Sequence, residues 1–544
     1  MTYMSGGAAI VQSLLKHDID TVFGLPGAQI YGLFDALYKV GDKINVIGAR
    51  HEQATAYMAF GYAKSTGRVG LYTVVPGLGV LNTTAALCTA YGCNTPVLCI
   101  TGQVPSAYLG KGRGHLHELP DQLATMRTLT KWAARIEHPA EAPRMVAEAF
   151  RQMTSGRPGP VSLEMCWDTM ERKTEVTLWK PIQADPPNPI DPDQIVRAAK
   201  MLVEAKKPMI MVGGGAIEAG KEIIELAETL QAPIVSFRSG RGIVSDDHDL
   251  GFTLVAGYNL WHDTDVLLGI GTRLEVPFMC WPYQPKGLKV VRIDIDPVEM
   301  VRLKPDMGIV GDAGIATGEL VKAVQNLLVV RPSPREEILE AKAKAKRDIQ
   351  KIQPQMAYLE TIREVLPRDG FFVEEISQVG FTAWFGFPVY RPRTFVTSGY
   401  QGTLGFGFPT SLGVKVANPD KAVVSVNGDG GFMYGVQELA TAVKYNIGVV
   451  SIIFNNNAYG NVRRDQMQRF KGRLICSDLV NPDFIRLAES FGMAGYRATT
   501  PGELKLSLEK ALGDSGPSLI EVPVETGSEA TPWEFIYPKQ HKDL

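Results

Sequence analysis

The sequence predicts an α/β protein made of three doubly wound parallel-sheet domains. Its 544 residues correspond to about three domains at the usual size of roughly 100–200 residues each. Short apolar segments typical of buried strands alternate with helical patterns along most of the chain, as they do in parallel sheets. A proline-rich stretch and a charged stretch interrupt this alternation. We therefore expect domains at residues 1–178, 190–332 and 355–530, followed by a tail at 531–544.

The first domain is predicted from strands at Val69–Val75 and Val97–Thr101 and from a helix at Glu52–Ser65. After it, Trp179–Pro192 holds five prolines, which disfavour both a helix and a central strand. Such a stretch is typical of an extended linker, so we expect a domain boundary there.

The second domain is predicted from four apolar segments, each bounded by Gly, Pro or charged residues: Pro208–Gly215, Ala232–Phe237, Asp265–Gly271 and Lys289–Asp294. Beyond them, Arg335–Gln353 is rich in Ala, Lys and charge and has little apolar face. This pattern predicts a solvated helix that connects the second domain to the third.

The third domain is predicted from five strands, at Phe371–Glu374, Thr394–Thr397, Ala422–Val426, Val449–Asn455 and Ser518–Val522. No segment of roughly 20–50 residues recurs, which excludes a solenoid. The tail has no clear period. It either folds over a neighbour or stays mobile, and the sequence leaves both open.

Composition excludes several classes of partner. Lys and Arg number 56 against 58 Asp and Glu, so no basic surface for nucleic acid or an anionic membrane is predicted. The six cysteines form no CxxC pair, which fits reduced thiols. The start of the chain lacks a basic leader segment, and no apolar run reaches about 18 residues. We predict a cytoplasmic enzyme without a nucleic-acid or membrane partner.

Two strands of the third domain end in polar loops. Ala422–Val426 runs into Asn427-Gly428-Asp429-Gly430-Gly431, where glycines let the backbone approach a phosphate and a following helix N-terminus favours an anion. Asp429 is a hard oxygen ligand suited to Mg²⁺. The strand Val449–Phe454 ends in Asn455-Asn456, at the same sheet edge. A bare tight turn would explain the Gly-Asp-Gly alone, but the second loop favours a shared metal and diphosphate site.

These two loops resemble the thiamine-diphosphate signature of the superfamily that includes acetolactate synthase large subunits, benzaldehyde lyase and pyruvate oxidase. The resemblance covers nearly the whole chain. It implies a pyrimidine-binding first domain, a central domain and a diphosphate-binding third domain. It also implies that Asp429, the Asn456 side chain and the Ala458 carbonyl bind Mg²⁺. By the same resemblance, Gly428, Gly430 and Gly431 lie at the diphosphate.

Three further residues take roles only through this resemblance. Glu52 opens a helix, where the helix dipole alone would explain an acid. The resemblance implies that Glu52 binds N1′ of the aminopyrimidine, which lets the cofactor act as its own base, and we expect Val75 and Leu78 to bury it. In the segment Gly399–Gly407, Leu404 would hold the cofactor bent and the Gly402 carbonyl would accept from its 4′ amino group. Ordinary core packing is the alternative for Leu404.

Several positions depart from the family pattern. Only Arg273 remains of an Arg-Phe-Asp-Asp-Arg-like segment that binds FAD in branched-chain acetolactate synthases, and the Gly213–Gly215 turn suits phosphates or a bare turn equally. We predict that FAD is weak, absent or without a redox role. Asp465 takes the place of an acceptor-side tryptophan. His117 and Glu118 replace a Phe-Gln pair.

We therefore expect an enzyme that acts on 2-oxo acids, 2-hydroxyketones or diketones through a carbanion–enamine, rather than a dedicated branched-chain acetolactate synthase. His117 is the candidate acid–base group and Gln29 its hydrogen-bonding helper. A solvent-facing histidine loop is the alternative, and a one-residue slip would move the role to Glu118.

The resemblance also implies a small-molecule carbonyl substrate and a homodimer or homotetramer, since one subunit's first domain completes the site of another's third domain. A simple 2-oxo acid decarboxylase is the nearest alternative. A non-catalytic regulatory homologue is a second alternative, but the intact Glu52, Asp429 and Asn456 argue against it.

Overall fold

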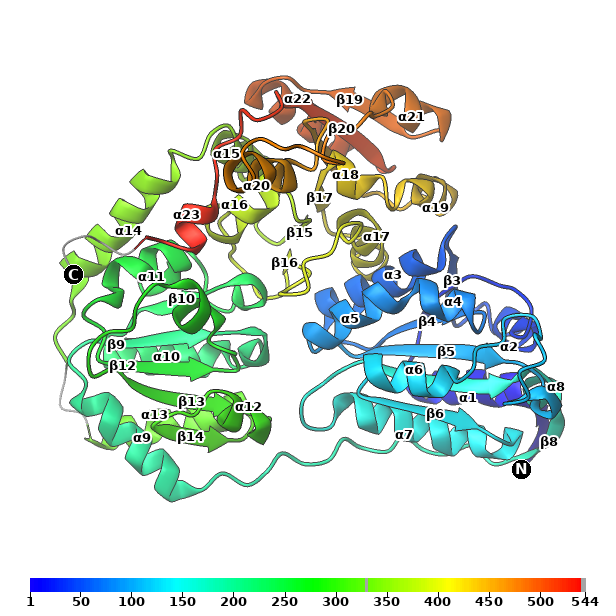
Figure 1. Cartoon of the computed structure of the whole chain (residues 1–544). Coiled ribbons are helices and arrows are strands. Elements are labelled where there is room, and N and C mark those ends of the chain that lie inside the picture. Colours follow the sequence, from blue (N-terminus) through cyan, green and yellow to red (C-terminus); the bar gives the residue numbers. More distant parts are fainter. Residues whose placement is uncertain (328–330, 540–544) are drawn as a thin grey trace.

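Three six-stranded sheets form the body of the protein (Figure 1). The computed structural model describes residues 1–327 and 331–539. The sheets have the strand orders β3-β2-β4-β5-β7-β6, β11-β10-β9-β12-β13-β14 and β16-β15-β17-β18-β20-β19. All neighbouring strands within them run parallel. This confirms the predicted fold class of three doubly wound parallel sheets.

The first sheet and its helices span the N-terminal part of the chain. Its elements are β1 (Thr2–Ser5), α1 (Gly6–Lys16), β2 (Thr21–Gly24), α2 (Tyr31–Tyr38), β3 (Asn45–Gly48), α3 (Glu52–Thr66), β4 (Gly70–Val74), α4 (Leu78–Asn82), α5 (Thr84–Gly92), β5 (Val97–Gln103), α6 (Gln122–Leu129), β6 (Trp132–Ile136), α7 (Ala142–Thr154), β7 (Val161–Cys166), α8 (Trp167–Glu171) and β8 (Lys173–Val176). The sequence did not predict the antiparallel pair β1–β8, which joins the start of the chain to the end of this domain.

The central sheet has six strands where four were predicted. Its elements are α9 (Pro192–Glu204), β9 (Pro208–Val212), α10 (Gly220–Leu230), β10 (Ile234–Ser236), β11 (Gly251–Thr253), α11 (Leu254–Trp261), β12 (Val266–Ile270), β13 (Lys289–Asp294), α12 (Pro297–Arg302), β14 (Met307–Val310) and α13 (Ala313–Leu327). The two missed strands, β11 and β14, are edge strands of three and four residues. Each contains a glycine, so neither shows an apolar run.

The connecting helix α14 (Arg335–Ile349) packs onto the central domain through a small part of its surface. Its buried side chains, Ile338, Ala341 and Ala345, lie on one narrow stripe. The Asn259 side chain of α11 donates to the Ala341 carbonyl at 3.1 Å. All other side chains of the helix are exposed or partly exposed, so the expectation of little apolar face agrees with the structure.

The C-terminal sheet also has one strand more than predicted, β19. Its elements are α15 (Gln355–Val365), β15 (Phe371–Glu374), α16 (Gln378–Gly386), β16 (Phe395–Val396), α17 (Gly407–Ala417), β17 (Val423–Gly428), α18 (Asp429–Phe432), α19 (Leu439–Lys444), β18 (Val450–Asn455), α20 (Gly460–Arg469), α21 (Phe484–Ser490), β19 (Ala494–Arg497), α22 (Pro501–Gly513), β20 (Ser518–Pro523) and α23 (Trp533–Ile536).

The tail folds back onto its own chain. Trp533 in α23 lies with its ring centroid 4.8 Å from that of Phe381, and its indole N–H donates to Asn461 Oδ1 at 2.6 Å. Ala530 donates its amide to the Gln353 carbonyl. The described part of the tail therefore covers α16 and α20.

The first and third domains touch through α3 and α17 (Figure 1). A Cβ on Gly61 would lie 2.2 Å from the Thr410 carbonyl oxygen, and one on Gly413 would lie 2.0 Å from that of Met58. Only glycine permits this close helix crossing. Glu438 adds a polar contact, since its carboxylate accepts from the amides of Arg50 and His51 at 3.0–3.2 Å. Among the residues that the structure describes, no helix is long and apolar enough to cross a membrane.

Candidate functional site

The predicted residues of the first domain gather at the carboxyl edge of its sheet. Strand order reverses between β2 and β4, and ligands of such sheets bind in the crevice at that point. Gln29 follows β2 and Gly77 follows β4, so both line this crevice. Glu52 begins α3 after β3, and His117 lies in the loop after β5.

A pair of hydrogen bonds fixes Gln29 against the His117 loop. The Gln29 amide nitrogen donates to the Leu116 carbonyl at 2.6 Å, which sets the orientation of the amide. Its oxygen therefore faces His117 Nδ1, at 2.8 Å. Because an amide oxygen can only accept, neutral His117 carries its proton on Nδ1 and leaves Nε2 as the free acceptor. Gln29 is fully buried and has a positive φ of 74°, so the turn itself holds its side chain in place.

The loop at Gly77 connects His117 to Glu52. The Gly77 amide donates to the Gln122 side chain at 2.7 Å, and a Cβ on Gly77 would lie 2.2 Å from the His117 carbonyl oxygen. Two residues later, a Cβ on Gly79 would lie 3.6 Å from Glu52 Cγ. The His117 loop therefore packs against Gly77, and Glu52 packs against Gly79, two residues further along the same turn.

Glu52 is the first residue of a helix whose start and end are both capped. His51 Nδ1 accepts from the Gln53 amide, and Gly67 ends the helix with a φ of 77°. Asn82 donates to Glu52 Oε2 at 3.0 Å. Val75 is buried as expected, but Leu78 is 65% exposed. The expected apolar cover from Leu78 is therefore missing within one chain.

Asp429 lies at the carboxyl end of β17 and is 2% exposed. Asn481 donates to its Oδ2 at 2.7 Å, and the same amide nitrogen lies 2.9 Å from Asn455 Oδ1. Burial raises the pKa of Asp429 above its usual range. Asn481 thus joins the two loops that the sequence predicted to share a metal.

Asn456 faces the same edge and is 7% exposed. Its Oδ1 accepts from the Ala458 amide at 3.1 Å, and its Nδ2 donates to Glu529 Oε2 at 2.7 Å. Burial raises the pKa of Glu529 as well. Among the described residues, no group of three or more His, Cys, Asp or Glu could hold a metal. A metal here would depend on one carboxylate, one amide oxygen and a carbonyl.

The turn after β17 is tight because its neighbours leave no room for side chains. A Cβ on Gly430 would lie 2.5 Å from Tyr459 Cε1, and one on Gly431 would lie 2.3 Å from Glu375 Oε1. At Gly428 the nearest atom is Ser377 Cβ, at 3.4 Å. Glycines keep the backbone of this turn close to the ends of β15 and β17.

Glu375 lies in the crevice between β15 and β17, where the order of the third sheet reverses. It is 1% exposed, and its Oε1 accepts from the Gly405 amide at 2.5 Å. Oε2 has no hydrogen-bond partner among the described residues. Burial raises the pKa of Glu375 to about 8 and that of the preceding Glu374 to about 7.

The glycine-rich segment at 399–407 is anchored to this carboxyl group through Gly405. Gly402 is exposed with a φ of 53°, and Leu404 is half-buried. Leu404 therefore does not belong to the buried core, which was the alternative to its role at a cofactor. Gly405 has a φ of 80°, and a Cβ there would lie 2.6 Å from Tyr434 Cβ.

Helix α20 presents a different face from the one expected. The Asp465 side chain is 46% exposed and lies 3.9 Å from the Arg469 guanidinium. The inner face instead carries Asn461 and Arg464, which hydrogen-bond to each other. Arg464 also donates to Gln378 Oε1 at 3.4 Å. These inward-facing residues were not singled out by the sequence, and the substrate-side position of Asp465 stays a prediction.

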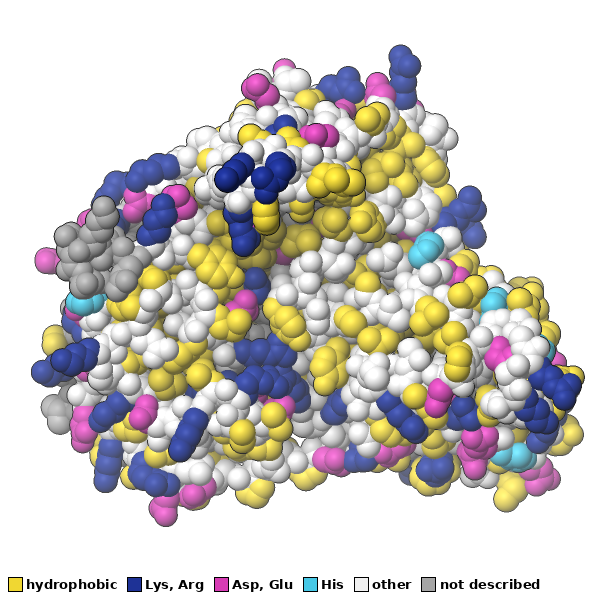
Figure 2. Space-filling model, viewed as in Figure 1, with side chains coloured by type: hydrophobic (Ala, Val, Ile, Leu, Met, Phe, Trp, Pro, Cys, Tyr) yellow, Lys and Arg dark blue, Asp and Glu magenta, His cyan; other side chains and the backbone are white. Residues whose placement is uncertain are grey.

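A cavity of about 490 Å³ lies between the first and central domains, and Figure 2 shows Lys and Arg side chains gathered in the hollow there. Lys64 lines it, 8% exposed, and burial lowers its pKa. Gly213 and Gly215 are required by packing, since their Cβ atoms would lie 2.5 and 2.9 Å from Gly271. Gly214 is less tightly enclosed, since a Cβ there would lie 3.2 Å from Ser239 Cβ and 4.0 Å from Lys64 Nζ.

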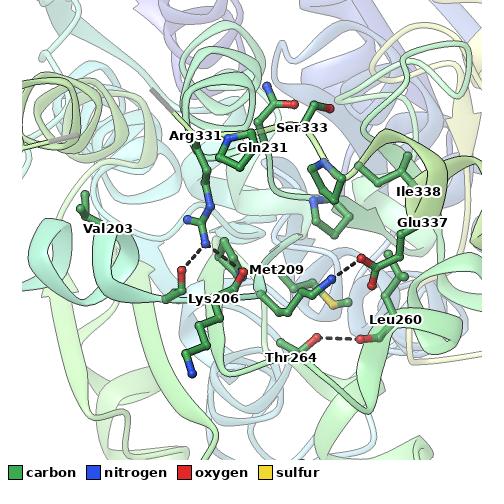
Figure 3. A pocket seen from close by; sticks show the side chains of 16 residues that line it. Val203, Lys206, Met209, Gln231, Leu260, Thr264, Arg331, Ser333, Glu337 and Ile338 are labelled. Carbon is green, nitrogen blue, oxygen red and sulfur yellow. Dashed lines mark hydrogen bonds and ion pairs between the residues drawn. The ribbon is translucent and has the colours of Figure 1, made fainter. Parts of the chain in front are cut away.

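A second cavity, of about 570 Å³, lies on the central domain beside β9 and the start of α14 (Figure 3). Three of its charged side chains, those of Lys207, Glu337 and Arg331, already have partners. Lys207 pairs with Glu337, and Arg331 donates to the carbonyls of Ala205 and Lys206. We therefore place the candidate functional site at the strand ends of the first and third domains and not here.

Within one chain the candidate residues form two groups. Glu52, Gln29 and His117 lie on the first domain, and Asp429, Asn456 and Ala458 lie on the third. No hydrogen bond or ion pair between described residues joins the two groups. Sequence reasoning missed Glu375, Asn481, Glu529 and Arg464. Of these, only Glu375 gave a signal, as an acidic pair directly after a predicted strand.

Three family models match the chain, one for each sheet. Residues 4–125 match the model described as thiamine pyrophosphate enzyme, N-terminal TPP binding domain. Residues 195–320 match the central domain and residues 375–522 the C-terminal TPP binding domain of the same enzymes.

Similar proteins extend over nearly the whole chain. A probable acetolactate synthase large subunit from Methanocaldococcus jannaschii is 33% identical over 97% of this chain and 93% of its own length. The acetolactate synthase large subunit of Haemophilus influenzae is 34% identical, over 99% and 97%. A probable 2-ketoarginine decarboxylase from Pseudomonas aeruginosa is 31% identical, over 95% and 94%.

Proposed function

Since this chain belongs to the thiamine pyrophosphate enzyme family that includes the acetolactate synthase large subunits, we propose that it is a carboligase or lyase. It would form or cleave a carbon–carbon bond beside the carbonyl of a 2-oxo acid, a 2-hydroxyketone or a diketone. The observation that carries this proposal is His117, which Gln29 holds with Nε2 free to accept a proton.

The residues at the third sheet fit a diphosphate with Mg²⁺. Asp429 and Asn456 offer hard oxygens of the kind Mg²⁺ binds together with phosphates, and the Ala458 carbonyl is a third donor. The Gly430-Gly431 turn supplies backbone amides, and the buried Glu375 Oε2 still lacks a partner among the described residues. Thiamine diphosphate, when bound, supplies a carbon nucleophile and an electron sink for the bond being changed.

The first domain would supply the proton-handling groups. Glu52 would hold a proton at the N1′ nitrogen of the bound aminopyrimidine. In a cleavage reaction, His117 Nε2 would accept the proton of the substrate hydroxyl as the carbon–carbon bond breaks, and in ligation it would return that proton. Gln29 keeps the imidazole in the tautomer that allows both steps.

A complete site would need two subunits. Leu78 beside Glu52 is 65% exposed, and Tyr434 close to the Asp429 turn is 50% exposed. Apolar side chains next to polar site residues are typical of surfaces that a partner covers. We propose a homodimer, or a tetramer built from two dimers, in which the first domain of one subunit faces the third domain of another.

A simple 2-oxo acid decarboxylase is the second candidate. The 2-ketoarginine decarboxylase relative favours it, because that protein covers the chain as fully as the synthases do. The two reactions differ in one step. A decarboxylase protonates the reactive carbon, whereas a ligase joins that carbon to a second carbonyl compound.

The central-domain cavity gives little support for an FAD site. Two of the three glycines in the Gly213–Gly215 turn are required by contacts with Gly271, so they do not indicate a phosphate site. In the same cavity Arg238 pairs with Glu275 and Arg157 with Asp296 and Glu299. We propose that FAD binds weakly, not at all, or without a redox role.

A product screen tests the proposed function. The enzyme loaded with Mg²⁺ and thiamine diphosphate is given pyruvate, longer 2-oxo acids, acyloins and cyclic diketones, and products are identified by mass. Coupled or cleaved products support the carboligase/lyase. Aldehyde and CO₂ alone support the decarboxylase, and no turnover of any compound contradicts both.

A further inference from the structure

Arg464 is the one arginine among residues 460–469 that forms no ion pair with a described carboxylate. Arg463 lies 2.8 Å from Asp478, and Arg469 lies 3.9 Å from Asp465. Arg464 instead donates to two neutral amide oxygens, those of Gln378 and Asn461. It is half-buried, and burial lowers its pKa. Burying a charged guanidinium without a counter-ion costs free energy, and a bound anion would offset that cost.

The contacts of Arg464 direct it toward the crevice of the third sheet. Gln378 is the first residue of α16 and follows Ser377, whose Cβ lies 3.4 Å from the Cβ position of Gly428. Asn461 stands one residue after the start of α20, directly beyond the loop that carries Asn456 and Ala458. The guanidinium therefore bridges the starts of α16 and α20, which lie next to the two loops proposed to hold the metal and the diphosphate.

The tail holds the surroundings of Arg464, and no described carboxylate forms an ion pair with it. Trp533 donates to the same Asn461 oxygen, at 2.6 Å, which fixes the amide that Arg464 contacts. The carboxylates whose charges act on Arg464 are Glu529 and Asp465. Glu529 is already bonded to Asn456, and Asp465 lies near Arg469 on the outer face. Both carboxylates act on Arg464 from a distance, and neither forms an ion pair with it.

We propose that Arg464 binds a carboxylate of the substrate, and that this carboxylate stays in the product. The inference rests on the proposed function. Arginine binds carboxylates through charged, often paired hydrogen bonds. Such a bond to the carboxylate that leaves as CO₂ would stabilise the ground state and slow its loss. The preferred substrate therefore carries a second carboxylate, at the end remote from the reacting carbonyl or on the acceptor.

Two acids that differ only at the remote end test this inference: 2-oxopentanoate ends in a methyl group, and 2-oxopentanedioate in a carboxylate. The parent should prefer the diacid. Arg464→Gln should raise KM for the diacid by about 10–100-fold, the usual loss for a hydrogen bond to a charged group, and change KM for 2-oxopentanoate less than about 2-fold. Arg464→Lys should restore part of the preference. Arg469→Gln, an exposed arginine of the same helix, is the matched control.

A binding measurement separates this inference from the proposed function. Pentanedioate, which cannot react, should raise the melting temperature of the parent holoenzyme and of Arg469→Gln but not of Arg464→Gln. Equal KM changes for both acids, or pentanedioate protection that survives Arg464→Gln, would overturn the role of Arg464. If the parent turns over no carbonyl compound at all, the proposed function fails, and the pentanedioate result still decides whether Arg464 binds a carboxylate.

Discussion

Glu375 Oε1 lies 2.5 Å from the amide nitrogen of Gly405, so a fully buried carboxyl group holds the glycine-rich segment at 399–407 in place. The same carboxyl group touches the Cβ position of Gly431. One side chain thus connects the segment that carries Gly402 and Leu404 to the turn proposed to hold the diphosphate.

Because the carboxyl groups of Glu375 and Glu374 are buried, we predict that the stability of the folded protein depends on pH. The pKa of Glu375 is raised to about 8 and that of Glu374 to about 7, both above the ordinary value of 4.5. The folded state therefore holds protons that the unfolded state has lost, and the stability they contribute is complete below about pH 4.5 and disappears as pH rises toward 8. We expect the unfolding free energy of the cofactor-free protein to fall over this window, with a slope of at most about 1.4 kcal/mol per pH unit for each group.

Urea unfolding at several pH values between 5.5 and 8.5 measures this slope. Glu375→Gln keeps an oxygen for the Gly405 amide but cannot ionise, so its slope should be smaller than that of the parent. Glu364→Gln, which changes an exposed carboxylate paired with Lys505, should leave the slope unchanged. A slope that Glu375→Gln does not reduce would show that Glu375 titrates normally.

Asp429→Ala should abolish the Mg²⁺ dependence of thiamine diphosphate binding. Asp429 is the one anionic ligand proposed for the metal, so its removal leaves only neutral oxygens. Calorimetric titration with and without Mg²⁺ measures the effect, and we expect at least about a tenfold loss of affinity. Asp465→Ala, on the exposed face of α20, should retain the affinity of the parent. Unchanged binding in Asp429→Ala would refute the assignment.

Glu52→Gln should bind the cofactor nearly as well as the parent but lose about 10²–10⁴-fold in rate. The amide can still hydrogen-bond to a ring nitrogen, but it cannot stabilise a proton there. Exchange of the C2 hydrogen of bound cofactor for deuterium, followed by NMR, reports this role directly. Glu319→Gln, an exposed carboxylate of α13, is the control. If exchange in Glu52→Gln proceeds at the parental rate, Glu52 has a different function.

The purified protein should show little or no flavin absorbance. Addition of FAD should not raise activity, because the Gly213–Gly215 turn is accounted for by its contacts with Gly271. Visible absorbance and mass analysis of the released cofactors measure this. A yellow protein with one FAD per chain would contradict weak or absent binding, and restored activity on adding FAD would contradict the absence of a redox role.

The sequence predicted features that lie close to strand ends and missed those that loops bring from elsewhere. Asp429 and Asn456 directly follow apolar strands, so the topology of a parallel sheet placed them at one edge. Asn481 and Glu529 reach the same edge from 52 and 73 residues away, and no local pattern marks them. On α20 the alignment gave the position of Asp465 but not its direction, since the inward face depends on where the helix begins.

His117→Ala should slow cleavage of 2-hydroxyketones and diketones by about 10²–10⁴-fold, the usual contribution of a positioned acid–base group. The bond from Gln29 leaves Nε2 as the acceptor, so Gln29→Met should lose part of this rate while His117 remains. His115→Ala tests the other histidine of the loop, because His115 Nδ1 lies 3.5 Å from Gln29 and lacks the short contact that fixes His117. Glu118 accepts a hydrogen bond from the His115 amide at 2.9 Å, so in this structure Glu118 stabilises the loop.

Initial rates of cleavage and of pyruvate self-condensation, measured side by side in the parent and the three variants, distinguish these roles. Efficient formation of acetolactate from pyruvate, unaffected by loss of His117, would refute both the histidine's role and the inferred preference for larger ketones.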